Sequence, residues 1–574
     1  MQSPVKLYPV PAISSLQEMI IKSANTYGDK LALEDLNETP IPRLSYSAVM
    51  KQILKFGAAL QSLGLKERSH IAVVGENRVQ WALSYLTAAC FNYVVVPVDR
   101  NLHQNEMLNV IHESDAEAVI FTAQFEQIFI ESHTSLHKVK QYISMDPISA
   151  GGQFHAMTEL IRNAKGCSLE ELPSIDPKAL SAIIFTSGTL GRAKGVMLSQ
   201  HNISSNLSAM LSMFMMYPKD RFLSVLPMHH TYECNCGLLC PLYAGSSIHF
   251  ARSLKTVTDD LQNVKATILL GVPLLYDKMF KRIHKGIQEK KTVAKILHPL
   301  IKLTDMMQSV GWKNAKKTVF KELHHKFGGS IRFFIAGGAA PDPMVAKGLR
   351  ELGFNFIQGY GLTETAPILA LNSPHKMKDD AAGLPLPGVE LRINQPDAEG
   401  IGEVFGKGPN VMLGYYKNPA ATAEVFQDGW FKTGDLGFID PDGFLHISGR
   451  KKNVIISKSG KNVFPEEIED VLNRSPFIME SLVYGAEDAK LGEIIAAQIV
   501  VDAEAFIELA ESSGKEITKE FLHQIIADEV GKTNKQLSSY KQVRKFLIRD
   551  QEFLKTTTQK IKRFANLAPE PMEE

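Results

Sequence analysis

A glycine- and hydroxyl-rich loop in the first half of the chain has the residue types that bind phosphate. It runs from Thr186 to Val196, with the sequence TSGTLGRAKGV, between two short apolar segments that predict strands. Glycines allow positive φ angles that turn backbone N–H groups inward, and hydroxyls add further donors. The residues suited to hold phosphate are Thr186, Ser187, Gly188, Thr189, Gly191 and the cation Lys194. The alternative is a flexible hairpin turn with surface hydroxyls.

This loop does not match the G-x-x-x-x-G-K-[ST] pattern of nucleoside triphosphatases. Ala193 replaces the second glycine, Gly195 replaces the Ser or Thr, and an apolar strand pattern follows in place of a helix. The sequence therefore predicts a strand, a phosphate-binding loop and a second strand.

Three of the five cysteines lie close together, but their spacing does not indicate a metal site. Cys234, Cys236 and Cys240 form neither a C-x-x-C pair nor part of a second ligand cluster, and their surroundings are apolar. Cysteine in such a stretch behaves as a small hydrophobic residue. An odd number of cysteines in a chain of 574 residues suits a reducing compartment better than a disulfide framework.

The composition is that of an ordinary globular protein. A chain of 574 residues exceeds a single hydrophobic core, so we expect two or more domains. Hydrophobic residues make up 44%, charged residues 22%, and the net charge of +1 gives no indication of nucleic-acid binding. The chain shows no secretory signal pattern and no run near the roughly 20 apolar residues that span a bilayer. We therefore expect a cytoplasmic protein, either soluble or attached at the cytoplasmic face of a membrane.

Helical and strand patterns alternate as far as Gly361. Apolar residues recur at helical spacing over 16–24, 46–63 and 78–90. Short apolar runs predict strands at 30–34, where we expect an edge strand, and at 70–74, 93–97, 118–122, 222–226, 268–270 and 331–336. This alternation predicts an α/β fold with layered helices and buried strands.

After Gly361 the pattern changes to short strands with Gly and Pro turns, which predicts a small β subdomain. A fresh α+β pattern begins near Gly449, with helices predicted over 465–472 and 519–532. The sequence thus predicts a large N-terminal domain over residues 1–449 and a C-terminal domain over residues 450–574.

A basic segment interrupts the alternation between residues 278 and 326. It contains thirteen Lys or Arg against three acidic residues, with apolar residues such as Ile296, Leu303 and Met307 at helical spacing. A basic amphipathic helical pair can lie on an anionic membrane, where each cation contributes about 1 kcal/mol. The alternative is a solvated helical face.

Four further stretches place chemically useful side chains in a fixed order. They are QGYGLTET at 358–365, GWFKTGDLG at 429–437, GRKK at 449–452 and KTTTQKIKR at 555–563. Together with the phosphate loop they resemble the adenylate-forming superfamily, the AMP-binding enzymes that include acyl-CoA synthetases, nonribosomal adenylation domains and firefly luciferase. The resemblance covers nearly the whole chain and implies activation of a carboxylate as a mixed anhydride with AMP, before a thiol attacks it.

The resemblance assigns nucleotide roles to the loop and to the second motif. It implies that Thr186 to Lys194 holds the β- and γ-phosphates of ATP and that Thr363 contacts the α-phosphate, while Glu364 holds Mg²⁺. Tyr360 would stack on adenine, with Gly361 beside it. The residues expected to line the other side of the base are Gly337, Gly338 and Ala339. The alternative for Tyr360 is simple core packing.

The later motifs supply the ribose, closing and hinge residues that the resemblance implies. Asp435 would accept hydrogen bonds from the ribose hydroxyls, and Arg450 would donate to ribose or phosphate. Lys560 would close the adenylation site, and Lys452 matches the hinge about which a mobile C-terminal domain rotates. The alternatives are a turn former for Asp435, a surface ion pair for Arg450 and an exposed basic tail around Lys560.

The chain departs from the usual family pattern at three positions. Leu190 stands where a second Thr is usual, Ala193 where Pro is usual, and Gln559 where many members have Gly. These departures remove a hydroxyl and relax two loops, so they bear on affinity more than on activity.

The segment at 226–233, LPMHHTYE, corresponds to the part of the family that lines the acyl pocket. The candidate pocket residues are His230, Tyr232, Glu233 and Cys234. The basic insertion resembles that of long-chain fatty acid CoA ligases, which implies a fatty acid and coenzyme A as substrates. One alternative is an acyl-acyl carrier protein synthetase, which uses the same adenylate. Another is a non-catalytic lipid- or nucleotide-binding homologue.

Overall fold

The computed structural model describes residues 5–38, 42–149, 151–186, 193–456, 461–488, 492–556 and 560–567. Contacts divide the chain into two compact units. The first comprises Met1–Leu391, Gly406–Phe431 and Asp442–Phe444, and the second comprises Arg392–Phe405, Lys432–Pro441 and Leu445–Glu574. The two units are described separately below, and the predicted division after residue 449 stays a proposal.

The first unit contains an eight-stranded sheet in the order β19-β9-β8-β4-β3-β5-β6-β7. Its strands are β3 (His70–Val74), β4 (Val94–Val98), β5 (Ala118–Phe121), β6 (Gln141–Ser144), β7 (Phe154–Ala156), β8 (Leu180–Thr186), β9 (Lys194–Ser199) and β19 (Gly414–Tyr415). Strands β3 to β8 pair in parallel, whereas β8, β9 and β19 pair antiparallel. The two strands predicted on either side of the phosphate loop are therefore confirmed, and residues 187–192 between them lie outside the described residues.

A second sheet of nine strands has the order β16-β15-β14-β13-β12-β10-β11-β1-β2. Its strands are β1 (Leu31–Asp35), β2 (Arg43–Ser45), β10 (Arg221–Ser224), β11 (Ser247–Phe250), β12 (Ile268–Gly271), β13 (Phe333–Ala336), β14 (Phe356–Gly361), β15 (Ile368–Leu371) and β16 (Leu384–Pro385). The predicted edge position of residues 30–34 is wrong, because the short strand β2 pairs antiparallel with β1 and forms the edge.

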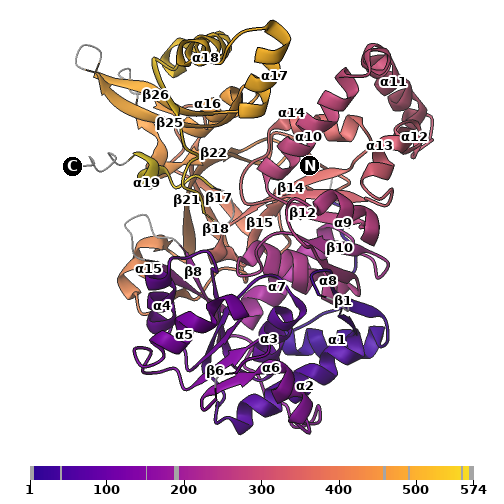
Figure 1. Ribbon diagram of the computed structural model, residues 1–574, viewed down its shortest axis with the longest axis vertical. Coiled ribbons are helices and arrows are strands. Elements are labelled where there is room, and N and C mark those ends of the chain that lie inside the picture. The colour runs from indigo at the N-terminus through magenta and orange to yellow at the C-terminus, as the bar shows by residue number, and fades with distance from the viewer. Residues whose placement is uncertain are drawn as a thin grey trace. The chain divides into compact units, whose positions relative to one another are not determined.

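Helices cover both sheets in layers (Figure 1). The helices and turns of this unit are α1 (Leu16–Tyr27), α2 (Tyr46–Ser62), α3 (Val79–Cys90), α4 (Gln104–Glu113), a 3₁₀ turn (Ala123–Phe125), α5 (Glu126–Ser132), α6 (Met157–Asn163), α7 (Gln200–Met213), a π-helix (Tyr232–Leu239), α8 (Cys240–Ala244), α9 (Val257–Val264), α14 (Pro343–Glu351), a 3₁₀ turn (Thr363–Thr365) and α15 (Pro419–Val425). Side chains alternate across strand β3: Ile71 and Val73 pack with α3, whereas Val74 packs with Ile111 of α4 on the other face.

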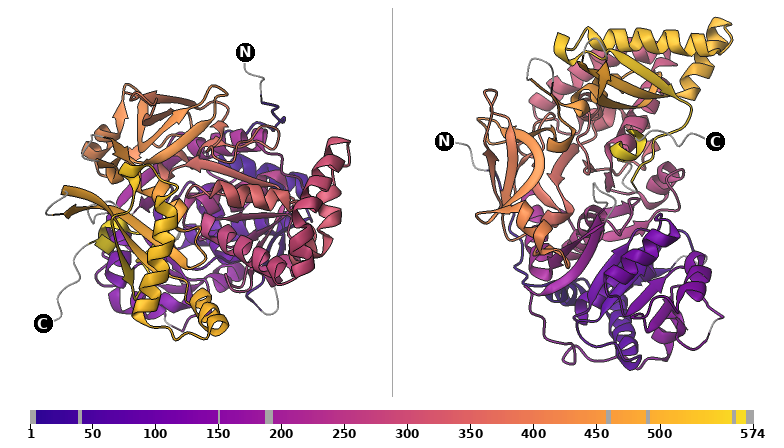
Figure 2. Two further views of the ribbon diagram at one scale, coloured as in Figure 1. Left: turned by 90° about the horizontal axis from the view of Figure 1, so that it is seen from above. Right: turned by 90° about the vertical axis from the view of Figure 1, so that its left-hand side faces the viewer.

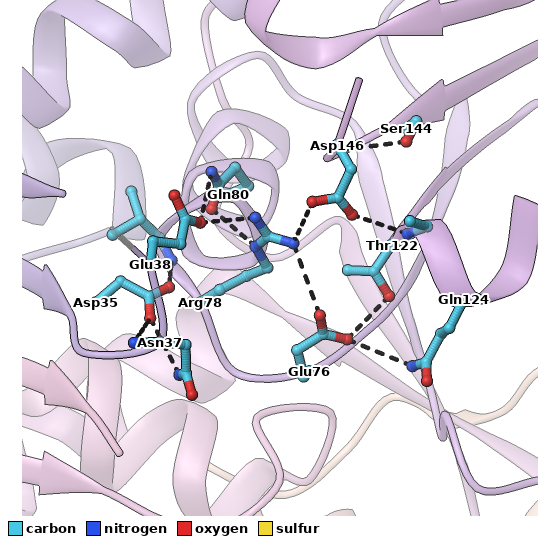
Figure 3. Close-up of polar contacts among 12 residues, drawn as sticks. Asp35, Asn37, Glu38, Glu76, Arg78, Gln80, Thr122, Gln124, Ser144 and Asp146 are labelled. Atoms are coloured by element: carbon cyan, nitrogen blue, oxygen red, sulfur yellow. Dashed lines mark hydrogen bonds and ion pairs between the residues drawn. The ribbon is translucent and has the colours of Figure 1, made fainter. Parts of the chain in front are cut away.

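A buried arginine connects the two sheets where their strands end (Figure 3). Arg78 lies just before α3, and its guanidinium contacts Glu38 at 2.6 Å, Asp146 at 2.8 Å and Glu76 at 3.6 Å. Glu38 follows β1 of the nine-stranded sheet, while Glu76 and Asp146 follow β3 and β6 of the eight-stranded sheet. The hydroxyl of Thr122 also donates to Glu76. Of these charged groups only the arginine is buried, so loss of its carboxylate partners would leave a buried cation unpaired.

The basic insertion forms four helices and not the predicted pair. They are α10 (Pro273–Gln288), α11 (Lys291–Ser309), α12 (Ala315–Val319) and α13 (Lys321–Lys326). The chain turns between α11 and α12 because Gly311 adopts a φ of 100°, which interrupts the helical run. Helix α10 packs by Tyr276 and Ile283 on the same apolar cluster as β12 and β13. Of the helices that the structure describes, none combines the length and the apolar composition needed to cross a bilayer.

The remaining strands form a small β subdomain and a C-terminal α+β unit. A five-stranded sheet contains β17 (Glu390–Asn394), β18 (Gly402–Lys407), β20 (Phe426–Gln427), β21 (Trp430–Ile439) and β22 (Leu445–Arg450). The elements that follow are a 3₁₀ turn (Lys451–Asn453), β23 (Ile455–Ile456), β24 (Asn462–Val463), α16 (Pro465–Leu472), β25 (Ile478–Asp488), β26 (Gly492–Val501), α17 (Ala503–Ser513), α18 (Lys519–Asn534), a 3₁₀ turn (Ser539–Lys541), β27 (Lys545–Arg549) and α19 (Arg563–Leu567). The α/β fold with a large N-terminal and a smaller C-terminal part is as predicted.

Candidate active site

The hairpin of β8 and β9 carries the two ends of the phosphate loop. Thr186 pairs with Lys194 across the hairpin, and its hydroxyl lies 3.4 Å from the Lys194 carbonyl oxygen. Gly195 lies so close to its neighbours that a Cβ there would be 2.9 Å from Ile183. The predicted loop residues Ser187, Gly188, Thr189 and Gly191 lie outside the described residues.

A tyrosine that the sequence did not single out connects the loop lysine to the predicted magnesium ligand. Strand β19 pairs with β9, which places Tyr415 opposite Val196 and beside Lys194. The Lys194 ammonium lies 4.9 Å from the centre of the Tyr415 ring, and the Tyr415 hydroxyl donates to Glu364 Oε1 at 2.9 Å. The arrangement brings a cation over the ring of Tyr415 and a carboxylate to its hydroxyl, from segments far apart in the sequence.

The motif at 358–365 presents its functional residues at the carboxyl end of a parallel strand. Strand β14 ends at Gly361, and a 3₁₀ turn over Thr363–Thr365 follows. A Cβ on Gly361 would lie 1.8 Å from the Pro367 carbonyl oxygen, so no other residue fits there without movement. Asn410 is buried, and its amide donates to the Thr365 and Ile368 carbonyls at 2.7 and 3.0 Å. Buried packing thus holds a turn on which Thr363 and Glu364 stay half-exposed.

The segment Gly337 to Ala339 lies at the same edge of the sheet. Ala336 of β13 pairs with Gln358 of β14, so the residues that follow each strand emerge side by side. Ligands of open α/β sheets bind at this carboxyl edge. A Cβ on Gly337 would lie 2.6 Å from the Tyr232 ring, whereas Gly338, with a φ of 86°, and Ala339 are exposed. Tyr360 is half-buried.

The predicted acyl-pocket residues lie at the start of a π-helix beside this edge. The Tyr232 hydroxyl donates to the Ile335 carbonyl at 3.1 Å, and the rings of His230 and His229 are in tilted contact with their centres 4.3 Å apart. Cys234 is buried, and burial raises the pKa of its thiol. π-Helical segments are frequent at functional sites.

Glu233 is the carboxylic acid among these residues. It is only 1% exposed, and burial raises its pKa to about 8. The Ser224 hydroxyl donates to Glu233 Oε1 at 2.5 Å, and Oε2 is buried with no hydrogen-bond partner among the residues that the structure describes. A Cβ on Gly237 would lie 2.7 Å from the carboxyl carbon of Glu233. The side chain is therefore a neutral acid at pH 7 in a closely packed place.

Asp435 and Arg450 are brought together by the register of two strands in the second unit. They are paired residues of β21 and β22, and Arg450 Nε lies 2.8 Å from Asp435 Oδ1. Asp435 is buried, whereas the Arg450 side chain is about half exposed. The surface ion pair that was the alternative for Arg450 is thus present, made with the other predicted ribose-binding residue.

Lys560 and Lys452 are both exposed. Lys560 lies on a turn closed by two backbone contacts. Lys555 forms an isolated β-bridge with Ile561, and the Thr556 amide donates a hydrogen bond to the Lys560 carbonyl oxygen at 2.8 Å. Its basic neighbours have structural partners: Lys555 contacts Glu480 at 2.5 Å, and Arg563 contacts both oxygens of Glu469 at 2.6 Å. These ion pairs hold Lys555 and Arg563, which lie before and after Lys560 in the sequence.

Comparisons with known proteins agree with this arrangement of motifs. The profile of the AMP-binding enzymes matches residues 20–416, and that of the AMP-binding enzyme C-terminal domain matches residues 467–560. The chain is 28% identical to a chloroplastic long-chain-fatty-acid–acyl-carrier-protein ligase of Arabidopsis thaliana, with 94% of this chain and 83% of that protein covered. It is 30% identical to long-chain-fatty-acid–CoA ligase 1 of Cavia porcellus, with 92% and 81% covered.

Solved structures share the fold. ATP-bound MatB from Rhodopseudomonas palustris gives a TM-score of 0.76 at 24% identity, with 96% of this chain and 98% of that chain covered. O-succinylbenzoate coenzyme A synthetase from Bacillus subtilis, in complex with ATP and magnesium ion, gives 0.72 at 22% identity with the same coverage.

Proposed function

This chain belongs to the family of AMP-binding enzymes, and we propose that it activates a long-chain fatty acid with ATP and transfers the acyl group to coenzyme A. The observation that carries the proposal is the array of Lys194, Tyr415 and Glu364 at the carboxyl edge of the sheets. A cation and a carboxylate that both contact one tyrosine support the proposal, because a triphosphate and its metal require groups of these two kinds. The names of the similar fatty acid ligases support the choice of substrate.

The proposed reaction has two steps. A carboxylate oxygen of the fatty acid attacks the α-phosphorus of ATP, the bond to the β-phosphate oxygen breaks, and pyrophosphate leaves. The thiol of coenzyme A then loses its proton and attacks the acyl carbon, the bond from that carbon to the phosphate oxygen breaks, and AMP leaves. The products are fatty acyl-CoA, AMP and pyrophosphate.

The residues around Glu364 suit Mg²⁺. One carboxylate supplemented by phosphate oxygens is a donor set that this hard cation prefers, and it needs no cluster of protein ligands. Mg²⁺ bound there would offset negative charge on the phosphates. The Tyr415 hydroxyl donates a hydrogen bond to one Glu364 oxygen, and Lys194 adds a second positive charge over the Tyr415 ring.

Further charges and donors complete the nucleotide site that we propose. The residues that would bind phosphate are Thr186, Ser187, Gly188, Thr189, Gly191, Lys194 and Thr363; those that would bind the base are Gly337, Gly338, Ala339, Tyr360 and Gly361; those that would bind the ribose are Asp435 and Arg450. Lys560 would reach the reacting oxygens by rotation about Lys452. Two unit charges 4 Å apart interact by about 1 kcal/mol in water and by about 4 kcal/mol at an effective dielectric of 20. Exclusion of water would therefore strengthen the attraction of the Lys560 ammonium for the reacting oxygens.

The apolar surroundings of the π-helix suit an alkyl chain, with His230, Tyr232, Glu233 and Cys234 as proposed pocket residues. Burial of one methylene contributes about 0.8 kcal/mol, so affinity grows with chain length where walls are apolar.

We propose a cytoplasmic location because all five cysteines are free, as reducing compartments favour.

An acyl carrier protein is the second candidate acceptor, because a similar plant protein is named as an acyl-carrier-protein ligase. Incubation with Mg-ATP and palmitate, with either coenzyme A or holo-acyl carrier protein added, distinguishes the two by mass spectrometry of the thioester. We expect palmitoyl-CoA and AMP. Palmitoyl carrier protein alone would favour the second candidate, and no acid-dependent pyrophosphate exchange would favour a non-catalytic homologue.

A further inference from the structure

Helix α11 exposes a line of apolar side chains along one face. Ile296, Pro299, Leu303, Met306 and the cap residue Val310 recur every three or four residues, which places them on one side of a helix that advances about 100° per residue. All five are exposed, Met306 to 60% and Val310 to 79%. We call these five residues the α11 stripe.

The fold does not require the α11 stripe for packing. A different face of the helix turns inward, where Ile301 and Thr304 are buried and Leu297 contacts the apolar cluster of β12 and β13. Figure 1 and the left view of Figure 2 show α11 and α12 at the outer edge of the first unit. Large apolar side chains gathered on an exposed face usually mark an interaction surface.

The surroundings of the stripe are basic and contain an aromatic residue. Lys295 and Lys302 are exposed and lie at one side of the stripe on the helix, and Lys313 is exposed after its end. Trp312, 51% exposed, follows the stripe directly. The nearby acid Asp305 already contacts Lys316 at 2.7 Å, so it offsets little of the remaining positive charge.

We propose that the α11 stripe inserts into the surface of an anionic lipid bilayer. Its apolar side chains would enter the acyl boundary, its lysines would extend their cationic ends to the lipid phosphates, and Trp312 would lie at the interface. Charge favours lipid over a second copy of the chain, because pairing two stripes brings two basic segments together. The proposal goes beyond the ligase reaction and does not depend on it.

Flotation of the full-length protein with vesicles tests the partner. We expect binding to phosphatidylcholine vesicles that contain phosphatidylserine, and weak binding to phosphatidylcholine alone. Each cation near an anionic surface changes binding by about fivefold, so Lys295→Gln/Lys302→Gln should lower partition by about an order of magnitude or more. The matched control Lys178→Gln/Lys255→Gln changes two exposed lysines elsewhere in the unit and should bind as the native protein does.

Apolar variants test the stripe itself. Leu303→Ser/Met306→Ser should lower partition by about tenfold or more, since each side chain contributes on the order of 1 kcal/mol when buried. The control Leu169→Ser/Leu254→Ser alters two exposed leucines outside the insertion. Circular dichroism and palmitate-dependent AMP formation without vesicles report whether each variant remains folded. Unchanged partition of both insertion variants would overturn the proposal.

Tryptophan fluorescence gives a local readout. Trp312 is exposed whereas Trp81 is fully buried, so vesicle binding should shift the emission to the blue and make it sensitive to brominated lipids. Trp312→Phe should remove that response. A response that persists in Trp312→Phe would contradict insertion at α11.

A second copy of the chain is the other occupant that the experiments can reveal. If the protein does not bind vesicles but self-associates without lipid, and Leu303→Ser/Met306→Ser abolishes that self-association, the stripe binds a second copy and the membrane proposal is overturned.

Discussion

The first unit and the C-terminal unit hold their candidate catalytic residues in different ways. In the first unit, Glu364 lies on a turn fixed by close packing, with the Gly361 backbone against Pro367 and a hydrogen bond from Tyr415. In the C-terminal unit, Lys560 is exposed on a turn whose ends are held by the pairs of Lys555 with Glu480 and Arg563 with Glu469. The difference indicates a closely packed turn that holds Glu364 and an exposed Lys560 whose neighbours are anchored within the C-terminal unit.

Removal of the lysine should give the largest effect on activity. Lys560→Ala should lower acid-dependent pyrophosphate exchange by about a hundred- to thousandfold, the loss typical when one charge-stabilising donor is removed. Thioester formation from supplied palmitoyl-adenylate and coenzyme A should survive. The matched control is Lys562→Ala, an exposed lysine on the same turn. Equal loss of both half-reactions would contradict the assignment of Lys560 to adenylation.

Loss of the ion pair between Arg563 and Glu469 should lower the free energy of unfolding of the C-terminal unit. Arg563→Ala leaves the Glu469 carboxyl, whose pKa burial raises to about 7, without its guanidinium partner. Breaking such a pair should lower the free energy of unfolding by about 3 kcal/mol. Urea unfolding of the C-terminal unit, followed in the full chain, measures this change. Arg544→Ala, which removes an exposed arginine of the same unit, is the control. Normal stability of Arg563→Ala would show that the turn is held by other contacts.

Loss of the hydrogen bond to Glu364 should have a moderate effect on chemistry. Tyr415→Phe keeps the ring over Lys194 and removes the hydroxyl donated to the carboxylate, a bond worth about 2 kcal/mol, or about thirtyfold in rate. We expect kcat to fall and the magnesium concentration for half-activity to rise. The control is Tyr416→Phe, whose hydroxyl donates to Asp115 away from Glu364. An unchanged magnesium dependence would separate Tyr415 from the metal site.

The buried acid of the π-helix should give the smallest effect, visible as pH dependence of stability. The folded pKa of Glu233 lies near 8, above its ordinary value of 4.5, so the unfolded chain loses this proton at lower pH than the folded chain. Between about pH 6 and about pH 7, Glu233 should therefore lower the free energy of unfolding by about 1 kcal/mol. This is the slope expected when one proton is bound only in the folded state.

Glu233→Gln should remove this contribution, since an amide keeps the oxygen that accepts from Ser224 and does not titrate. Glu159→Gln, an exposed acid of the same unit, should leave the slope unchanged. An identical slope in Glu233→Gln and the native protein, followed by urea unfolding at several pH values, would show that Glu233 is ionised in the fold.

Local patterns predicted most elements, because burial imposes a period on the residues of one segment. The helix at 465–472 and the hairpin around the phosphate loop followed from such patterns. Pairings between distant segments could not be predicted this way. The position of Tyr415 beside Lys194 and the contacts of Arg78 with Glu38 and Asp146 depend on residues far apart in sequence. Asp435 and Arg450 were expected separately, and the register of β21 and β22 joins them.

The fate of the carboxylate oxygen tests the proposed chemistry most directly. Palmitate labelled with ¹⁸O in its carboxyl group is incubated with the protein, Mg-ATP and coenzyme A, and the nucleotide products are analysed by mass spectrometry. Attack of the carboxylate on the α-phosphorus predicts AMP that carries one labelled oxygen, together with unlabelled pyrophosphate. Label in inorganic phosphate with release of ADP, or thioester formed without labelled AMP, would contradict an acyl-adenylate.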